Sequence, residues 1–495
     1  MGLDIGAAVD EVPLTTLEDH AFTMKNFAAQ RGTAILFLSA RCEATDNQID
    51  EINSVHSRFR LRDVLFVGIC PNAAETPEEL RTFAQRRGCT FPIYRDPQGD
   101  ATKLLAPTAT PEAFLIDAKG VLQYRGAVAG LENAITLITK NRPVEAPEVA
   151  AEGTPIGADL APRDIDDQYG TIAFSSEVIF EKAPGAVAHH CSTLCEAANG
   201  DLLCLWYGGT YESAEDQVLF LARLPKSDRH WSTPEAVVKN PGQPPGNAVI
   251  FRDGLGRIWI VWGRMEAERP IRRGSGWGQC RLLYRISEDH GATWGDDREF
   301  EASFGWLPRN VTITRSDDAL CLPLSGVVDG TYGSFFLETK DNGQTWKRSG
   351  VVPGGSQPTM IERDDGSLLF MMRSRPMILE STSDDLGVTW KPAQKSALRN
   401  PDAGIAMTKL DNGHAVIVFN DSSVARTPLS VARSVDSGQR WEKPLDLETN
   451  PGEYSYPSVI QASDSLIHVT YTFRRYAIKH VAFSESWLTD FERPN

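Results

Sequence analysis

The 495-residue sequence contains no uninterrupted apolar run that approaches the roughly 18–20 residues of a membrane-spanning helix, so we expect no membrane segment. Its first residues, MGLDIGAAVDEVPLTT, lack the basic segment and apolar core of a secretory signal, and we therefore expect a cytoplasmic protein. Cysteine is sparse, with eight residues scattered along the chain, which favours reduced thiols over a disulfide framework.

Positive charge is also in deficit, because 50 Lys and Arg residues face 66 Asp and Glu residues, for a net charge of −16. Nucleic acids and anionic lipids attract basic surfaces, so we expect neither nucleic acid nor a membrane as a main partner. An anionic small substrate remains possible where arginines gather locally. The sequence lacks H-x-x-x-H, a C-x-x-C pair and a calcium-loop pattern, and we expect no metal site and no cofactor.

A chain of this length should hold more than one core, and its two parts differ in pattern. Residues 1–140 alternate short apolar runs, which predict buried strands, with apolar residues at helical spacing. This alternation predicts an α/β sandwich. Its expected elements are strands over 33–40 and 63–70, helices over 45–59 and 76–88, and a hairpin over 112–126.

The segments FLSARCEAT and TPEAFLIDAKG resemble the thioredoxin-like fold of redoxins and peroxiredoxins. In that resemblance Cys42 takes the place of the nucleophilic thiol at a helix start, and Thr110-Pro111 matches the cis-proline facing it. A helix N-terminus and the neighbouring Arg41 would both lower the pKa of a thiol. The motif is Cys-Glu-Ala-Thr, without a second cysteine, so we expect a one-cysteine redox reaction or a docking module without redox activity. Cys70 and Cys89 could resolve at a distance, but buried inert thiols are the commoner interpretation.

Residues 141–175 are rich in Pro, Ala, Gly and acids and show no periodicity, which predicts a linker. From residue 176 to 495 short strand signals alternate with turn signals every 8 to 12 residues, which predicts an all-β domain.

One turn recurs four times in this second part, with Trp-to-Trp spacings of 52, 44 and 51 residues, and a degenerate copy lies at 224–234. A period of this size with four strands per unit indicates a β-propeller, and the length of the region predicts six blades. The four copies are SEDHGATWG (287–295), TKDNGQTW (339–346), TSDDLGVTW (382–390) and SVDSGQRW (434–441).

These turns resemble the Asp-box of sialidase-type propellers. The hydroxyl and carboxylate can bind backbone N–H groups, and the Trp can wedge between neighbouring blades. The resemblance implies a structural role, away from substrate, for Asp289, Asp341, Asp385 and Asp436.

The candidate site residues come from the stretches between the Asp-boxes. The segment AHHCSTLCEAANGDLLCLWYGGTYESAEDQ resembles the sialidase opening. His190 lies where that family keeps the first arginine of its carboxylate-binding triad, and Glu212 and Asp216 lie in the loop of its acid/base. Histidine is titratable, whereas arginine is always charged and can bind a carboxylate through two N–H groups at once, so the substitution changes the chemistry. The structural alternative for His189 and His190 is one buried and one surface histidine.

Polar residues punctuate later strands in the same way. Asn247 precedes a strand and Arg264 ends the next, and Gln357 and Arg373 repeat the arrangement. By resemblance, Arg373 matches the second triad arginine. These four, together with Arg426 and Arg475 of the last segments, are the candidate substrate-binding residues.

The last two segments resemble sialidases best. Arg426, in RTPL, matches the third arginine, and Tyr456, in YSYP, matches the tyrosine nucleophile. Glu453 is close enough in sequence to polarise that tyrosine, and Arg474 and Arg475 add positive charge.

Three functions fit these residues. The first is an exo-acting glycoside hydrolase of sialidase-like type, which cleaves a terminal acidic sugar from a sialoside or uronide-containing glycan. The second is a His/Tyr-dependent uronate lyase, and the third a non-catalytic propeller scaffold with a redox-sensing domain. The enzyme hypotheses require that the fold brings His190, Arg373, Arg426 and Tyr456 together around one cavity.

Overall fold

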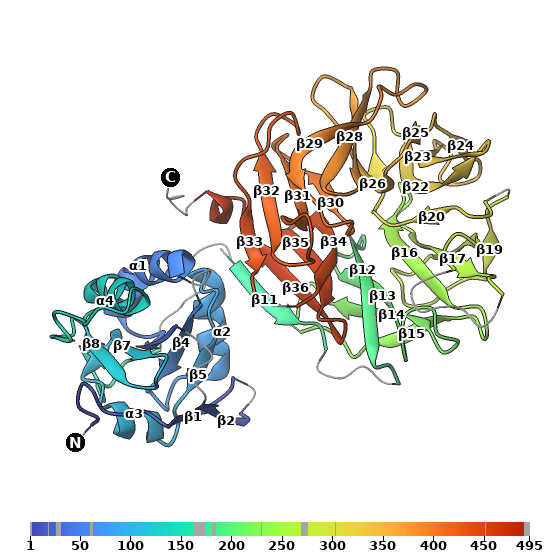
Figure 1. The fold of residues 1–495 in the computed structure, drawn as a ribbon. Helices are drawn as coiled ribbons and strands as arrows, with labels where there is room; N and C mark the ends of the chain where they lie inside the picture. The colour runs from blue at the N-terminus through green and yellow to red at the C-terminus, as the bar shows by residue number, and fades with distance from the viewer. Residues whose placement is uncertain are drawn as a thin grey trace. The chain divides into compact units, whose positions relative to one another are not determined.

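The structure is a computed structural model that describes residues 2–17, 19–25, 31–59, 63–162, 174–180, 185–228, 230–268, 276–301, 303–450 and 452–489. The chain divides into two compact units, Met1–Ser175 with Phe483–Asn495, and Ser176–Ala482. Figure 1 shows the mixed α/β unit in blue and cyan and the all-β unit in green to red.

The N-terminal unit has the predicted strand–helix–strand–helix–hairpin order, built on an eight-stranded sheet in the order β2-β1-β5-β4-β3-β7-β8-β9. The central strand β3 pairs in parallel with β4 and antiparallel with β7. The strands are β1 (Glu11–Thr15), β2 (Ala21–Lys25), β3 (Gly32–Phe37), β4 (Val64–Cys70), β5 (Ile93–Arg95), β6 (Ala109–Thr110), β7 (Glu112–Asp117), β8 (Leu122–Gly126), β9 (Glu148–Val149) and β10 (Thr154–Pro155). The helices are α1 (Glu43–Phe59), α2 (Pro77–Arg86), α3 (Asp100–Leu105), the 3-10 turn η3 (Val128–Gly130) and α4 (Leu131–Thr139).

Local sequence explains the two longest helices. In α1 the residues at helical spacing, Ile49, Ile52, Val55 and Phe59, are all buried against the sheet. Helix α2 starts at a capping box in which Thr76 and Glu79 exchange side-chain and backbone hydrogen bonds. Apolar clusters cover both faces of the sheet, as expected for an α/β sandwich.

The range 141–175, predicted as a linker, is partly ordered against the N-terminal unit. Strand β9 pairs in parallel with β8, and β10 pairs antiparallel with β6. Residues 163–173 of that range lie outside the described residues. Periodicity could not find β9 and β10, because two-residue strands carry no alternating pattern.

The second unit is a propeller of six antiparallel sheets, in which the inner strands come first in each blade (Figure 1). In the last blade β11, from the start of the unit, pairs beside the C-terminal strand β36, so both ends of the propeller meet in one sheet. Blade 1 comprises β12 (Ala188–Glu196), β13 (Leu202–Gly209), β14 (Val218–Leu224) and β15 (Glu235–Lys239), and blade 2 comprises β16 (Pro245–Arg252), β17 (Ile258–Met265), β18 (Cys280–Ser287) and β19 (Arg298–Glu299). Blade 3 comprises β20 (Leu307–Pro308), β21 (Ile313–Thr314), β22 (Leu320–Val328), β23 (Thr331–Thr339), β24 (Lys347–Arg348) and β25 (Val352–Pro353), and blade 4 comprises β26 (Ser356–Glu362), β27 (Leu368–Arg373), β28 (Met377–Ser383) and β29 (Gln394–Arg399). Blade 5 comprises β30 (Ala406–Lys409), β31 (Ala415–Asn420), β32 (Leu429–Ser434) and β33 (Leu445–Glu448), and blade 6 comprises β11 (Phe174–Val178), β34 (Tyr454–Gln461), β35 (Ile467–Phe473) and β36 (Ala477–Phe483), with the 3-10 turn η4 (Ser486–Leu488) after β36.

The Asp-box turns have the expected internal hydrogen bonds. In the first, the Ser287 hydroxyl accepts from the N–H of Gly291 at 2.8 Å, and Asp289 accepts from the N–H of Thr293 at 2.8 Å. The pattern repeats at Asp341, Asp385 and Asp436. Hydrogen bonds from the Thr345 hydroxyl and N–H lower the pKa of Asp341 to about 2. The carboxylate of Asp341 is therefore ionised and bonded within its own turn.

Candidate active site

The inner strands of four blades share one irregularity, a β-bulge at which a non-glycine residue takes a left-handed backbone. The residues are Cys191 (φ 63°), Asn247 (φ 46°), Gln357 (φ 48°) and Tyr456 (φ 52°), and the pairing register shifts at each of them. A bulge re-aims the side chain that it carries, and each strained residue costs about 1–3 kcal/mol. Repeated strain at equivalent points marks this end of the inner strands as a candidate site.

Tyr456 is the centre of the cluster found there. Its hydroxyl accepts a 2.6 Å hydrogen bond from Nη1 of Arg373. The guanidinium carbons of Arg309, Arg373 and Arg426 lie 5.2, 5.7 and 5.2 Å from its ring centroid. The ring is 8% exposed, so these cations act in a largely water-excluded setting where their field is strong.

His190 contacts the same ring edge-to-face, with centroids 4.4 Å apart. Its Nδ1 hydrogen-bonds the Thr472 hydroxyl at 2.9 Å, while Nε2 is buried without a partner within the described residues. Burial, followed by the positive charges of Arg475 and Arg426, holds the pKa of His190 well below its usual value. His190 is therefore neutral at physiological pH and can accept or donate one proton at Nε2.

The interpretation of one buried and one surface histidine is wrong, because His189 and His190 are 1% and 2% exposed. His189 faces the blade interior, where its Nδ1 accepts from the indole N–H of Trp206 at 3.0 Å. Successive strand residues face opposite sides, so only one of the pair reaches the arginines.

Glu453 holds two of the arginines rather than the tyrosine. It accepts from Arg426 at 2.6 Å and from Arg475 at 2.9 Å, and its third bond comes from the Ser455 hydroxyl. Burial opposes ionisation, but the two arginines outweigh it and lower the pKa of Glu453. The hydroxyl of Tyr456 is instead bonded by Arg373.

Arg475 reaches the cluster from a strained hairpin between β35 and β36. Arg474 and Arg475 have φ of 50° and 63°, values that tight hairpins normally assign to Asn or Gly. The carbonyl of Arg475 accepts from the N–H of His189 at 2.8 Å, and its side chain binds Glu212 at 2.6 Å. Glu212 also accepts from the indole of Trp277 at 3.1 Å, so the acidic loop is fixed to the hairpin.

A polar chain extends from Arg373 to blade 2. Arg373 donates to Gln357 at 3.0 Å, and Gln357 donates to Asn247 at 3.4 Å. On its other side Arg373 binds the exposed Asp402 at 2.7 Å. The structure thus links the predicted residues Asn247, Gln357 and Arg373 to Tyr456.

Two predicted residues have partners elsewhere. Arg264 binds Glu266 at 2.7 Å, in a surface network with Arg281. Asp216 accepts from the N–H and hydroxyl of Thr210, at 3.0 and 2.6 Å, and so closes its own loop. Neither has a described contact with the arginines around Tyr456.

Arg309, in the segment LPRNVT of blade 3, was not among the predicted site residues. It is 1% exposed and donates to the carbonyls of Ser192 in blade 1 and Pro457 in blade 6, at 3.3 and 2.7 Å. Within the described chain it has no carboxylate partner. Like Asn247 and Gln357, Arg309 is a polar residue in the first segment of its blade, directly after β20, and this position was the available signal. With Arg309, all six blades contribute to the cluster.

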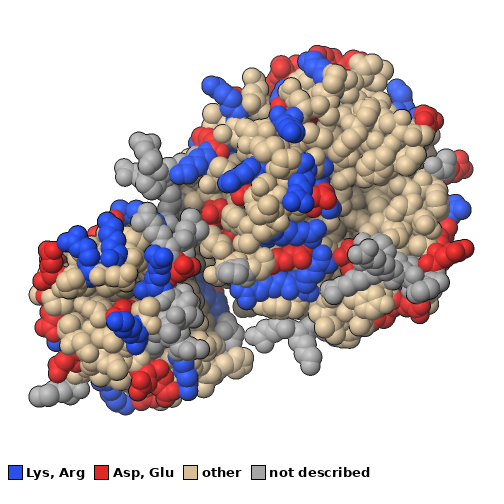
Figure 2. Space-filling model, viewed as in Figure 1, with Lys and Arg blue, Asp and Glu red and all other residues tan. Residues whose placement is uncertain are grey.

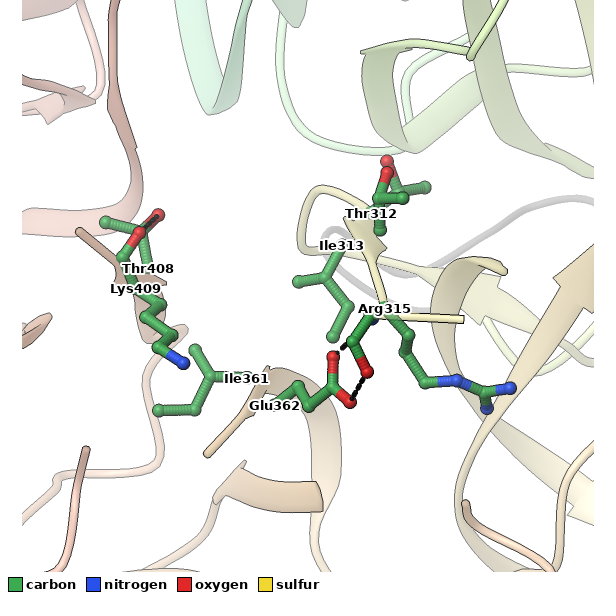
Figure 3. Close-up of a pocket in the computed structure, with 9 residues that line it drawn as sticks. Thr312, Ile313, Arg315, Ile361, Glu362, Thr408 and Lys409 are labelled. Atoms are coloured by element: carbon green, nitrogen blue, oxygen red, sulfur yellow. Dashed lines mark hydrogen bonds between the residues drawn. The ribbon is translucent and has the colours of Figure 1, made fainter. Parts of the chain in front are cut away.

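A separate cavity of about 450 Å³ lies at the opposite ends of the inner strands, lined by residues such as Ile361 and Thr408 (Figure 3). Its charged groups already have protein partners: Glu362 binds Ser316, Lys409 binds Asp364, and Arg315 binds Asp317. Figure 2 shows basic and acidic side chains next to one another on parts of this face of the propeller. In contrast to the charged groups of this cavity, Arg309 beside Tyr456 has no carboxylate partner among the described residues.

In the N-terminal unit Cys42 lies directly before α1 and is fully buried. Burial raises its pKa, but hydrogen bonds involving Thr154, Thr110 and Thr45 outweigh burial, and the pKa of the thiol is lowered overall. Burial raises the pKa of Cys70 well above its ordinary value and that of Cys89 to about 12, which leaves both as inert thiols.

No cluster of three or more His, Cys, Asp or Glu side chains suited to a metal ion occurs among the described residues. The helices in the described ranges include none long and apolar enough to cross a membrane.

The geometry and the comparisons agree on the class of protein, a sialidase-like six-bladed propeller preceded by a redoxin domain. The model of the BNR repeat-like domain family matches residues 200–469, and the chain belongs to that family. The model of the AhpC/TSA family matches residues 5–125.

Solved sialidases share the fold at low identity. The Hadza microbial sialidase Hz136 aligns with TM-score 0.54 and 18% identity, over 61% of this chain and 66% of that chain. The sialidase of Trypanosoma rangeli aligns with TM-score 0.51 and 16% identity, over 64% of this chain and 60% of that chain. The NanB sialidase of Streptococcus pneumoniae aligns with TM-score 0.52 and 14% identity, over 76% of this chain and 84% of that chain.

Among curated proteins, the thiol-disulfide oxidoreductase ResA of Geobacillus kaustophilus is 24% identical over 116 residues, which is 23% of this chain. ResA of Bacillus thuringiensis is 23% identical over 118 residues. The match spans 65% of the first relative's own length and only the N-terminal part of this chain.

Proposed function

We propose that the propeller is a glycan-cleaving enzyme, an exo-acting glycoside hydrolase for a terminal acidic sugar of a sialoside or uronide-containing glycan. The observation that carries the proposal is the placement of Arg309, Arg373 and Arg426 over one face or edge of the Tyr456 ring, at 5.2 to 5.7 Å. A guanidinium group can bind a carboxylate through two parallel hydrogen bonds, and three arginines close together favour the binding of an anionic sugar.

Charge counting supports an anionic ligand. The cluster holds four arginines, at 309, 373, 426 and 475, against three carboxylates, at 212, 402 and 453. One positive charge is left over, and a substrate carboxylate would balance it. Asp402 is the carboxylate most easily displaced, because its side chain is 57% exposed.

In hydrolysis Tyr456 would serve as nucleophile or as stabiliser of the oxocarbenium-like transition state. A neutral phenol is suited to this role, because a carboxylate would repel the anionic sugar. Glu212 is the candidate acid/base, since it is anchored beside the cluster by Arg475 and Trp277. Asp216 is less suited, because its carboxylate already closes its loop.

Elimination at a uronate is a second candidate, favoured by the contact of His190 with Tyr456. The neutral His190 has an unpartnered Nε2, which could take the proton α to the carboxylate. The electron pair would form a C=C bond as the glycosidic bond breaks, and the Tyr456 hydroxyl would protonate the departing oxygen. The arginines would stabilise the charge that builds on the carboxylate.

Turnover of a panel of sialoside, uronide and rhamnoside substrates tests both candidates. The wild type is compared with Tyr456→Phe and with Tyr332→Phe, a matched loss of a hydroxyl from a residue that is 50% exposed on blade 3. Hydrolysis predicts new reducing ends without near-ultraviolet absorbance, and elimination predicts an unsaturated, absorbing product. Turnover that survives in Tyr456→Phe would contradict the role proposed for Tyr456, and no turnover on any acidic substrate would favour a non-catalytic scaffold.

A further inference from the structure

The Cys42 thiol is sealed by a segment of the same chain. Its Sγ lies 3.1 Å from the Thr154 hydroxyl and 3.0 Å from the Thr110 carbonyl, and the residue has no exposed surface. Thr154 belongs to residues 152–160, which we call the strap. A thiol placed at a helix start, where thiols are reactive, is thus shielded by chain from outside the family-matched region of 5–125.

The strap is held as an added strand. Thr154 and Pro155 pair antiparallel with Thr110 and Ala109 of β6, and the N–H of Ile156 donates to Thr108 at 3.0 Å. This pairing places the strap along the edge of β6 beside the thiol.

Two side chains flanking Cys42 fasten the strap at both ends. Gln48 of α1 donates to the carbonyl of Glu152 at 2.7 Å, and Arg41 donates to the carbonyl of Leu160 at 3.1 Å. Both bonds run to the strap's backbone, so they recognise an extended chain rather than particular side chains. Arg41 is itself oriented by Glu79 at 2.9 Å.

The strap fits tightly at Gly153. A Cβ on Gly153 would lie 2.3 Å from the Thr110 carbonyl oxygen, a backbone atom that cannot yield. Glu152, Gly153 and Pro155 are otherwise exposed, and the pairing has only two residues. A short exposed strand with few apolar contacts opens at much lower free energy than the core.

We propose that the strap is an autoinhibitory element, which fills the edge of β6 and shields Cys42, so that thiol chemistry at Cys42 requires the strap to leave. The proposal concerns the N-terminal unit alone and stands apart from the function proposed for the propeller.

Labelling of the full chain with a maleimide tests the strap. All eight cysteines are buried, so modification of Cys42, located by peptide mass spectrometry, should be slow in the wild type. Gly153→Val forces the strap off β6 and should raise the Cys42 rate by about tenfold or more, because labelling follows the open population. Ala150→Val, an added side chain at an exposed position just before the strap, is the matched control and should label like the wild type. Equal rates in the two variants would overturn the proposal.

A second variant covers the case in which Gly153→Val loosens the whole domain, which labelling of Cys70 and Cys89 would reveal. Thr154→Cys places a thiol beside Cys42, and oxidised glutathione should join the two in a disulfide, with two reduced glutathiones as the other product. The bond should form in the folded protein and block maleimide at Cys42 until a reductant is added. Absence of that cross-link would count against the strap as decisively as equal labelling rates.

Discussion

Arg373 donates a 2.6 Å hydrogen bond to the hydroxyl of Tyr456, although the two residues lie 83 positions apart in the sequence. Arg373 ends β27 in blade 4, and Tyr456 lies on a bulge of β34 in blade 6. Their meeting requires the closed ring of blades. Because the arginine occupies one lone pair of the phenol oxygen, the hydroxyl proton is left free for a ligand.

Replacing Arg373 by Lys tests that bond. Lysine keeps the charge but cannot bond Tyr456, Gln357 and Asp402 at once, as the guanidinium does. We expect kcat/KM on the acidic substrate to fall by about 10²–10³, the loss typical of one electrostatic donor in a dry site. Arg348→Lys, on the outer surface of blade 3, should stay within about twofold of wild type. A similar loss in both would mean that Arg373 matters for folding rather than for the site.

Arg309 should contribute to stability as well as to charge. Arg309→Met keeps the bulk but removes the hydrogen bonds from Arg309 to the carbonyls of Ser192 in blade 1 and Pro457 in blade 6. Each orphaned carbonyl costs about 1–3 kcal/mol, so the free energy of unfolding should drop by about 2–6 kcal/mol, measured with urea. Arg309→Lys can keep one bond and should lose about half as much. An unchanged urea midpoint in Arg309→Met would show that these bonds do not hold the blades together.

The fold was predictable because its signals are local and repeated. Each Asp-box closes on itself within five residues, as Ser287 and Gly291 do, so the blades could be counted from sequence. Strands around Cys42 were found for the same reason. Strands β9 and β10 were not, because they exist only through pairing with β8 and β6.

The candidate site was predictable in part. His190, Arg373 and Arg426 all contact Tyr456, which meets one part of what the enzyme hypotheses required, whereas a shared cavity around them stays a prediction. The partners of Glu453 could not be foreseen, because this residue lies just before β34 and binds Arg426 and Arg475, which come from other parts of the chain. Arg309 was missed because its partners come from blades 1 and 6.

The closeness of neighbouring blades can be tested at an Asp-box glycine. Gly343 has a φ of 84°, and a Cβ there would lie 2.5 Å from the ring of Trp259 in blade 2. Gly343→Ala should destabilise the protein by about 2 kcal/mol or more, from backbone strain and overpacking together. Gly330 has a similar φ of 79°, but a Cβ there would meet open space. Gly330→Ala therefore measures the cost of backbone strain alone, and it should lower the free energy of unfolding by less than Gly343→Ala does. Both variants should retain the wild-type kcat. Equal urea midpoints would mean that the Asp-box of blade 3 does not pack tightly on blade 2.

Stability should depend on pH through the buried histidines. Burial lowers the pKa of His189 from 6.5 to about 4 and lowers that of His480 too. A histidine with a depressed pKa is neutral when folded, so the unfolded chain binds more protons between pH 4 and 6.5. The stabilising contribution is complete above pH 6.5 and is lost as the pH falls toward 4. The free energy of unfolding should fall across this window, and His189→Gln should reduce the slope by up to about 1.4 kcal/mol per pH unit. A matched change at the exposed His230 should leave the slope unaltered.

Finally, His190→Gln separates the two reactions. Glutamine fills similar space and can bond Thr472, but it cannot take a proton. If the enzyme eliminates, kcat should fall by about 10²–10⁴ with little change in KM, because a proton acceptor is missing only in the transition state. If it hydrolyses through Tyr456, the loss should be nearer tenfold, since His190 then only supports the ring. His189→Gln, the adjacent buried histidine whose ring faces Trp206, is the control for packing and should change kcat by less than either amount.

A pH profile of wild-type kcat/KM completes the test, because elimination requires neutral His190 and its depressed pKa predicts activity that persists below pH 6.5. Activity lost with an apparent pKa near 6.5 would show that the essential histidine is not buried as His190 is.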